Sequence, residues 1–117
     1  MKKLAYAGVG IVATAVAIAV VVTRHAGWWP LVIFAIAPDL SFLAGMSGDL
    51  QRGQLHPRAV PLYNAVHRYW APVVLVAITF FIGSPAWLGA GLAWIAHISF
   101  DRSLGFGLRT PEGFQRA

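Results

Sequence analysis

Four long apolar segments, separated by short polar stretches, run along this chain. They cover residues 4–22, 28–46, 62–82 and 86–106. A helix rises about 1.5 Å per residue, so about 20 apolar residues match the hydrocarbon thickness of a bilayer, about 30 Å. The pattern therefore predicts an all-α fold, a four-helix transmembrane bundle, as a single membrane domain over residues 1–117.

The first segment also admits a second interpretation, because Lys2 and Lys3 precede it as basic residues precede a signal peptide. The nineteen residues from Leu4 to Val22 are long for the apolar part of a signal peptide, and the residues after Val22 make a poor cleavage site. We therefore expect a retained span, with cleavage left open as the alternative.

Prolines and glycines mark special positions in the last two segments. Pro61 fits the first turn of a helix, whereas Pro72 predicts a kink inside one. Gly89 and Gly91 are small enough to let neighbouring helices approach closely. We expect helix packing, not ligand binding, at these two glycines.

Composition agrees with a membrane protein. The chain is 58% hydrophobic and 11% charged, whereas ordinary soluble domains are about 25% charged. It has no cysteine, which excludes disulfides, thiolate metal sites and a cysteine nucleophile. The net charge of +5 comes from Lys and Arg spread between the apolar segments rather than along one face. We therefore expect the lipid bilayer as a partner, and no nucleic acid.

The distribution of basic residues predicts the orientation, because Lys and Arg accumulate in short cytoplasmic segments. With a cytoplasmic N-terminus and four spans, all basic residues between the segments but one fall inside. Arg24 is then outside, and the inside set is Lys2, Lys3, Arg52, Arg58, Arg109 and Arg116. This pattern predicts a bacterial inner membrane protein with both termini in the cytoplasm.

Four ionisable residues lie inside the apolar segments at similar depth. They are Asp39, His67, His97 and Asp101, from three different segments. At the helical rise, each lies about 6–14 Å from the cytoplasmic end of its segment. Buried polar groups in membranes usually face the bundle interior, pair with one another and mark function. We expect these four side chains to converge.

Two histidines and two carboxylates form a plausible ligand set for Zn or Mn. Such an ion lowers the pKa of a bound water toward neutrality and so provides a nucleophile for hydrolysis. Asn64, three residues before His67, is a candidate to orient a ligand or a substrate oxygen. Arg68 and Arg102 are candidates to attract a phosphate or carboxylate group and to stabilise developing negative charge.

The same residues allow a structural interpretation. Asp39 and Asp101 would then pair with Arg68 and Arg102, while the histidines stay neutral and hydrogen-bond across helices. Geometry distinguishes the two: a metal site needs the four side chains near one point, whereas the structural alternative places each acid against an arginine.

Several motifs resemble a known family. They are Pro38–Leu43, Tyr63–His67, Trp94–Arg102, Leu104–Leu108 and Gly113–Phe114. In order and spacing they resemble the small bacterial membrane proteins classed as domain of unknown function 4260, over residues 37–114. The chain departs from that family at Phe106, where the family typically has tyrosine, and in lacking its acidic tail after Phe114.

The family has no assigned activity, so this resemblance supports the membrane assignment alone. A more distant similarity links the chain to predicted membrane-bound metal-dependent hydrolases. That similarity implies that Asp39, His67, His97 and Asp101 are metal ligands.

The sequence thus leaves two functions open. One is a metal-dependent hydrolase with a cytoplasm-facing site for a membrane-embedded lipid or phosphorylated substrate. The other is a non-enzymatic membrane protein whose polar cluster is structural or binds a small ligand or ion. Transport is less favoured because four spans are few for a pathway unless the chain forms a homo-oligomer, and the oligomeric state stays open.

Overall fold

The computed structural model describes residues 2–40, 54–106 and 108–114. Within these ranges the chain is all-α and contains no β-strand, which confirms the all-α part of the predicted fold class. The helices are α1 (Lys2–Thr23), α2 (Trp29–Ile36), the short 3-10 helices η1 (Ala37–Asp39) and η2 (Pro57–Ala59), α4 (Val60–Val66), α5 (Trp70–Ile82) and α6 (Pro85–Ser103).

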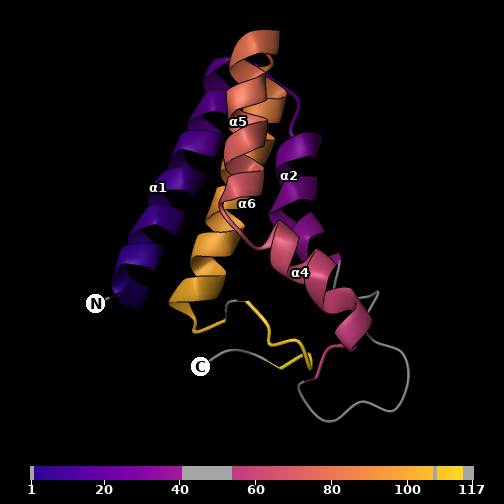
Figure 1. Ribbon diagram of the computed structural model, residues 1–117. Helices are drawn as coiled ribbons and strands as arrows, with labels where there is room; N and C mark the ends of the chain where they lie inside the picture. Colours follow the sequence, from indigo (N-terminus) through magenta and orange to yellow (C-terminus); the bar gives the residue numbers. More distant parts are fainter. Residues whose placement is uncertain (1, 41–53, 107, 115–117) are drawn as a thin grey trace.

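Helix α6 is the centre of the fold, and α1, α2 and α5 all pack against it. The chain runs up along α1, down along α2, up again through α4 and α5, and down along α6 (Figure 1). The start of α1 and the segment 108–114 therefore lie at the same end of the molecule, on the side of α4.

Small residues on α6 make this packing close. A Cβ atom added at Gly89 would lie 2.9 Å from Cγ2 of Val21 in α1, and one at Gly91 would lie 2.7 Å from Cγ2 of Val76 in α5. Both distances are too short for a real contact, so only glycine fits without a shift. The expected packing role of the two glycines is confirmed.

The turn between α5 and α6 follows from its local sequence. Gly83 ends α5 in the left-handed region at φ 65°, which glycine adopts readily. Ser84 then caps α6, because its Oγ accepts a hydrogen bond from the Trp87 N–H, and Pro85 occupies the first turn.

The predicted third segment contains two helices, not one. Helix α4 ends at Val66 and α5 begins at Trp70, and the pair bends by 42°. Pro72 explains the break, because it has no N–H to donate and its ring would clash with the carbonyl of Arg68 in a continuous helix. The kink expected inside a helix is therefore a break upstream of Pro72, which lies in the first turn of α5.

The described helices differ in their ability to cross a membrane. Helix α1 is long and apolar enough to do so alone, and only 22% of its most apolar window is buried. The bent pair from Pro57 to Ile82 passes the same test when taken together. Trp29–Asp39 is apolar but shorter, and residues 41–46 of the predicted second segment lie outside the described residues.

A second, smaller core lies at the α4 end of the molecule. It contains Leu55, Ala59, Val60 and Tyr63. The C-terminal segment 108–114 docks on this core: the Leu55 N–H donates to the Gly113 carbonyl at 2.8 Å. Gly113 has φ 102° and approaches the Leu55 backbone so closely that a side chain would clash with it.

Candidate metal centre

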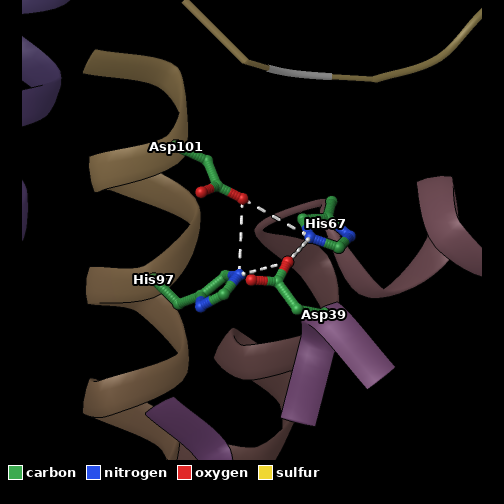
Figure 2. Close-up of side chains that lie close together, drawn as sticks. All are labelled: Asp39, His67, His97 and Asp101. Carbon is green, nitrogen blue, oxygen red and sulfur yellow. Dashed lines mark hydrogen bonds and ion pairs between the residues drawn. The ribbon is translucent and has the colours of Figure 1, made fainter. Parts of the chain in front are cut away.

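The four predicted ligands converge at one point (Figure 2). Asp39 ends η1, His67 caps the end of α4, and His97 and Asp101 lie one turn apart on α6. One potential ligand atom from each residue lies within 4.8 Å of all the others. Three separate elements therefore supply one compact cluster, as the shared depth in the sequence predicted.

The imidazole Nε2 atoms face the carboxylates. Nε2 of His97 lies 3.1 Å from Asp39 Oδ1 and 3.3 Å from Asp101 Oδ2. Nε2 of His67 lies 3.3 Å and 3.5 Å from the same two oxygens. Each histidine thus contacts both acids.

Backbone carbonyls fix the proton on the other nitrogen of each ring. Nδ1 of His97 lies 2.7 Å from the Ala35 carbonyl oxygen, and Nδ1 of His67 lies 2.8 Å from the Tyr63 carbonyl oxygen. A carbonyl only accepts, so each Nδ1 must carry the hydrogen and donate it. In a neutral ring, Nε2 then carries no hydrogen, and its lone pair points toward the cluster. Metal-binding histidines typically have this arrangement.

Local structure places these two carbonyls next to the histidine rings. At η1 the backbone changes from the α-helical to the 3-10 hydrogen-bond pattern, which leaves carbonyls of the last turn of α2 for other donors. At the end of α4, the His67 ring stacks on the Tyr63 ring at 4.0 Å between centroids, with its Nδ1 over the Tyr63 carbonyl.

The cluster needs added positive charge. Two carboxylates and two neutral Nε2 atoms are all acceptors, and acceptors do not pair without a proton or a cation between them. Protons on both Nε2 atoms, or one divalent ion, would each balance the two negative charges. A tetrahedral ion with N and O ligands at about 2.0–2.2 Å separates them by about 3.3–3.6 Å. The four His–Asp distances, 3.1–3.5 Å, are close to that range.

The cluster is buried on one side and open on the other. The side chains of His67 and His97 are 2% and 9% exposed, and that of Asp101 is 23% exposed. The Asp39 side chain is 59% exposed. The histidines are therefore the buried members of the cluster, and Asp39 is its most exposed member.

The chain matches the family described as Domain of unknown function (DUF4260) over residues 7–117. It belongs to this family. The match confirms the resemblance seen in the sequence motifs and extends it to most of α1. No curated protein and no solved structure matches the chain.

The other predicted site residues of this DUF4260 protein do not join the four predicted ligands. The Asn64 side chain pairs with the backbone of Arg109: its Nδ2 donates to the Arg109 carbonyl at 3.0 Å, and its Oδ1 accepts from the Arg109 N–H at 2.7 Å. Arg68 is exposed. Arg102 lies beside the cluster and donates to the His67 carbonyl at 3.4 Å.

The arginine pairing of the structural alternative is not formed. Among the described residues, the ion pairs of Asp39 and Asp101 are with His67 and His97, not with arginine. The acids therefore face the histidines, as a metal site requires.

Some supporting groups were not predicted from the sequence. The carbonyls of Ala35 and Tyr63 carry no signal, because every residue has one. Arg109 was expected as a charge in a cytoplasmic tail, yet it is buried with its guanidinium 4.9 Å from the Tyr63 ring centroid. It supports the ring on which His67 stacks.

Proposed function

We propose that this DUF4260 protein is a four-span inner membrane protein that binds one divalent ion, Zn or Mn, and hydrolyses a lipid or phosphorylated substrate. The observation that carries the proposal is the convergence of Asp39, His67, His97 and Asp101, with both Nε2 atoms oriented by backbone carbonyls. Such a bond to the outer nitrogen holds a histidine in the tautomer that binds a metal.

The outer surface supports membrane insertion. Large apolar side chains are exposed along the helices, and Phe80 and Phe81 of α5 are 74% and 89% exposed. Soluble monomers rarely expose continuous apolar surfaces, whereas lipid covers them at no cost. The up-down-up-down course of α1, α2, α5 and α6 fits an even number of crossings (Figure 1). The excess of basic residues on the side of both termini favours a cytoplasmic location for them.

In this proposal a bound ion supplies Lewis acidity and an activated water near neutral pH. The two buried histidines and Asp101 hold the ion in place. Asp39, the exposed ligand, borders the side from which water and substrate reach the site. Arg102, next to the cluster, provides positive charge for an anionic substrate or transition state. Arg68 is exposed, so the proposal assigns the electrostatic role to Arg102.

The non-enzymatic function remains the competing proposal, and one observation favours it. Nε2–oxygen distances of 3.1–3.5 Å also suit long hydrogen bonds from protonated histidines to carboxylates. In that case, hydrogen bonds within the cluster would hold η1, α4 and α6 together without a metal ion.

Hydrolysis assays on the full chain in mild detergent test the proposal. Protein stripped with EDTA and then supplied with Zn or Mn is assayed on p-nitrophenyl phosphate, bis(p-nitrophenyl) phosphate and dioctanoyl phosphatidic acid. We expect turnover that requires the metal and that falls by about 100-fold or more in His97→Asn. The matched control is His25→Asn, in the turn after α1, because Asn tolerates the positive φ of His25.

Turnover that does not require the metal would contradict a metal-dependent hydrolase. An equal loss of turnover in His97→Asn and His25→Asn would also contradict it. Metal binding without turnover of any of the three esters would favour the non-enzymatic function.

A further inference from the structure

A pocket opens at the end of the molecule away from α4, between the end of α1 and the turn that joins α5 to α6 (Figure 1). We call it the turn pocket. Its volume is about 380 Å³, within the range of about 300–1,000 Å³ that is usual for ligand sites. The residues that line it come from three helices and include Val20, Arg24, Phe80, Ser84 and Leu88. A cation, a hydroxyl and large apolar side chains therefore face one continuous space.

Arg24 supplies the positive charge of the turn pocket. It follows the last residue of α1 and is exposed. Within the described part of the chain, its side chain makes no hydrogen bond and no ion pair. A guanidinium offers five N–H donors in a planar fork. These donors are therefore available to a ligand in the pocket.

No acidic side chain of the described ranges compensates this charge. Asp39 and Asp101 lie in the candidate metal centre, and Glu112 lies in the segment that docks at the α4 end. Helix α6 rises about 24 Å between Pro85, beside the pocket, and Asp101. An anion that pairs with Arg24 must therefore come from outside these ranges, as a ligand would.

Ser84 adds a second donor to the same pocket. Its Oγ accepts a hydrogen bond from the Trp87 N–H at 3.3 Å, which caps α6. Its own O–H has no acceptor among residues 2–40, 54–106 and 108–114. A charged donor and a neutral donor that face one space suit the oxygens of a phosphate group.

The rest of the turn pocket suits an acyl chain. Val20, Phe80 and Leu88 form apolar walls, and Phe80 is 74% exposed. In the turn that follows α1, Trp28 and Trp29 are 48% and 58% exposed. Tryptophans gather where lipid headgroups meet the hydrocarbon of a bilayer. In the proposed membrane location, the pocket therefore lies at the depth at which a lipid has its phosphate and the start of its chains.

We propose that the turn pocket binds one anionic phospholipid. The phosphate accepts hydrogen bonds from Arg24 and Ser84, and the first part of an acyl chain packs against Val20, Phe80 and Leu88. Charge and shape agree, because the cation and the apolar walls belong to one pocket. The proposal rests on the membrane location proposed above, but not on a bound metal or on hydrolysis.

Native mass spectrometry of the EDTA-stripped full chain in detergent tests the site. The probes are dioleoyl phosphatidylglycerol, dioleoyl phosphatidylcholine and inorganic phosphate. We expect the wild type to retain phosphatidylglycerol over phosphatidylcholine. One basic residue near a membrane surface changes the affinity for anionic lipid about fivefold, so Arg24→Gln should lower this preference by about that factor. The matched control is Arg68→Gln, which removes the same charge from an exposed position at the α4 end and should keep the preference.

A second pair of variants tests the apolar part of the pocket. Val20→Trp fills the space beside Arg24 and should lower retention of both lipids. The matched control is Val12→Trp, which makes the same change at an exposed position of α1 outside the turn pocket. Circular dichroism and gel-filtration elution show whether each variant is folded.

Equal losses in Arg24→Gln and Arg68→Gln would overturn the proposal, because binding would then follow net charge alone. Retention of inorganic phosphate in place of lipid would also overturn it, as would equal retention of both lipids by Val20→Trp and Val12→Trp. Because metal is absent throughout, a failed lipid site leaves the metal-dependent function standing. Failure of that function in turn leaves these lipid results unchanged.

Discussion

The histidines and aspartates of the cluster are held by different kinds of contact. Each imidazole donates from Nδ1 to a backbone carbonyl and is almost fully buried. The hydrogen bonds and ion pairs that the two carboxylate groups make within the described chain are to the histidines. The histidines therefore define the site, and Asp39, its most exposed residue, has the most freedom to move.

Asn64 has a structural role in this account. Its amide makes two hydrogen bonds to the Arg109 backbone and so ties the C-terminal segment to α4. We expect Asn64→Ala to lower the free energy of unfolding by about 1–3 kcal/mol, because each bond contributes about 0.5–1.5 kcal/mol. Denaturant titration of the detergent-solubilised chain measures this loss.

Asn64→Asp is the matched control for this prediction. It keeps the oxygen that accepts from the Arg109 N–H but places a second acceptor against the Arg109 carbonyl, so the loss should be at least as large as in Asn64→Ala. If Asn64→Ala abolished turnover without changing stability, Asn64 would contact the substrate, as the sequence first suggested.

At the residue scale, the members of the cluster were predictable from the sequence, and the groups that support them were not. Charged and imidazole groups are costly in apolar segments, so Asp39, His67, His97 and Asp101 stand out in the sequence. The partner of Asn64 lies 45 positions away, and only the docking of the C-terminal segment brings it there. Arg109 is buried for the same reason, although its charge alone favours a solvated tail.

At the scale of elements, close packing around α6 holds the ligand helices in place. Gly91→Ala would put a Cβ atom 2.7 Å from Val76 Cγ2 and push α5 away from α6. Overpacking of this kind typically costs about 1–3 kcal/mol, and we expect that loss in the free energy of unfolding.

Gly8→Ala provides the control for Gly91→Ala, because no atom lies within 4 Å of the added Cβ. Alanine favours helix over glycine by about 1 kcal/mol, so this change should be neutral or stabilising. Equal destabilisation by both substitutions would show that the α5–α6 contact is looser than described.

The helix elements were predictable in kind but less so in extent. Apolar runs and turn residues predicted helices in each segment, and Ser84 and Gly83 mark the turn between the last two. We expected the break at Pro72, but it lies between Val66 and Trp70. The reason is that a proline disturbs the helical turn that precedes it. That shift matters for the site, since the break leaves His67 at a helix end facing α6.

At the scale of the whole molecule, the proposed topology of four crossings would place Gly27 outside the cytoplasm and Glu112 inside. The chain has no cysteine, so a single introduced cysteine is the only thiol that a maleimide can label. A membrane-impermeant maleimide added to intact cells should label Gly27→Cys and leave Glu112→Cys unlabelled until the membrane is opened. Labelling of both from outside would contradict the proposed topology.

Metal content tests the central proposal most directly. The full chain is purified in mild detergent without chelators, incubated with Zn or Mn, separated from free ion and analysed by elemental mass spectrometry. The account predicts about one tightly bound ion per chain in the wild type and in His25→Asn, and affinity at least about tenfold weaker in His97→Asn and Asp101→Asn. A well-folded wild type that stays free of metal after this treatment would contradict it.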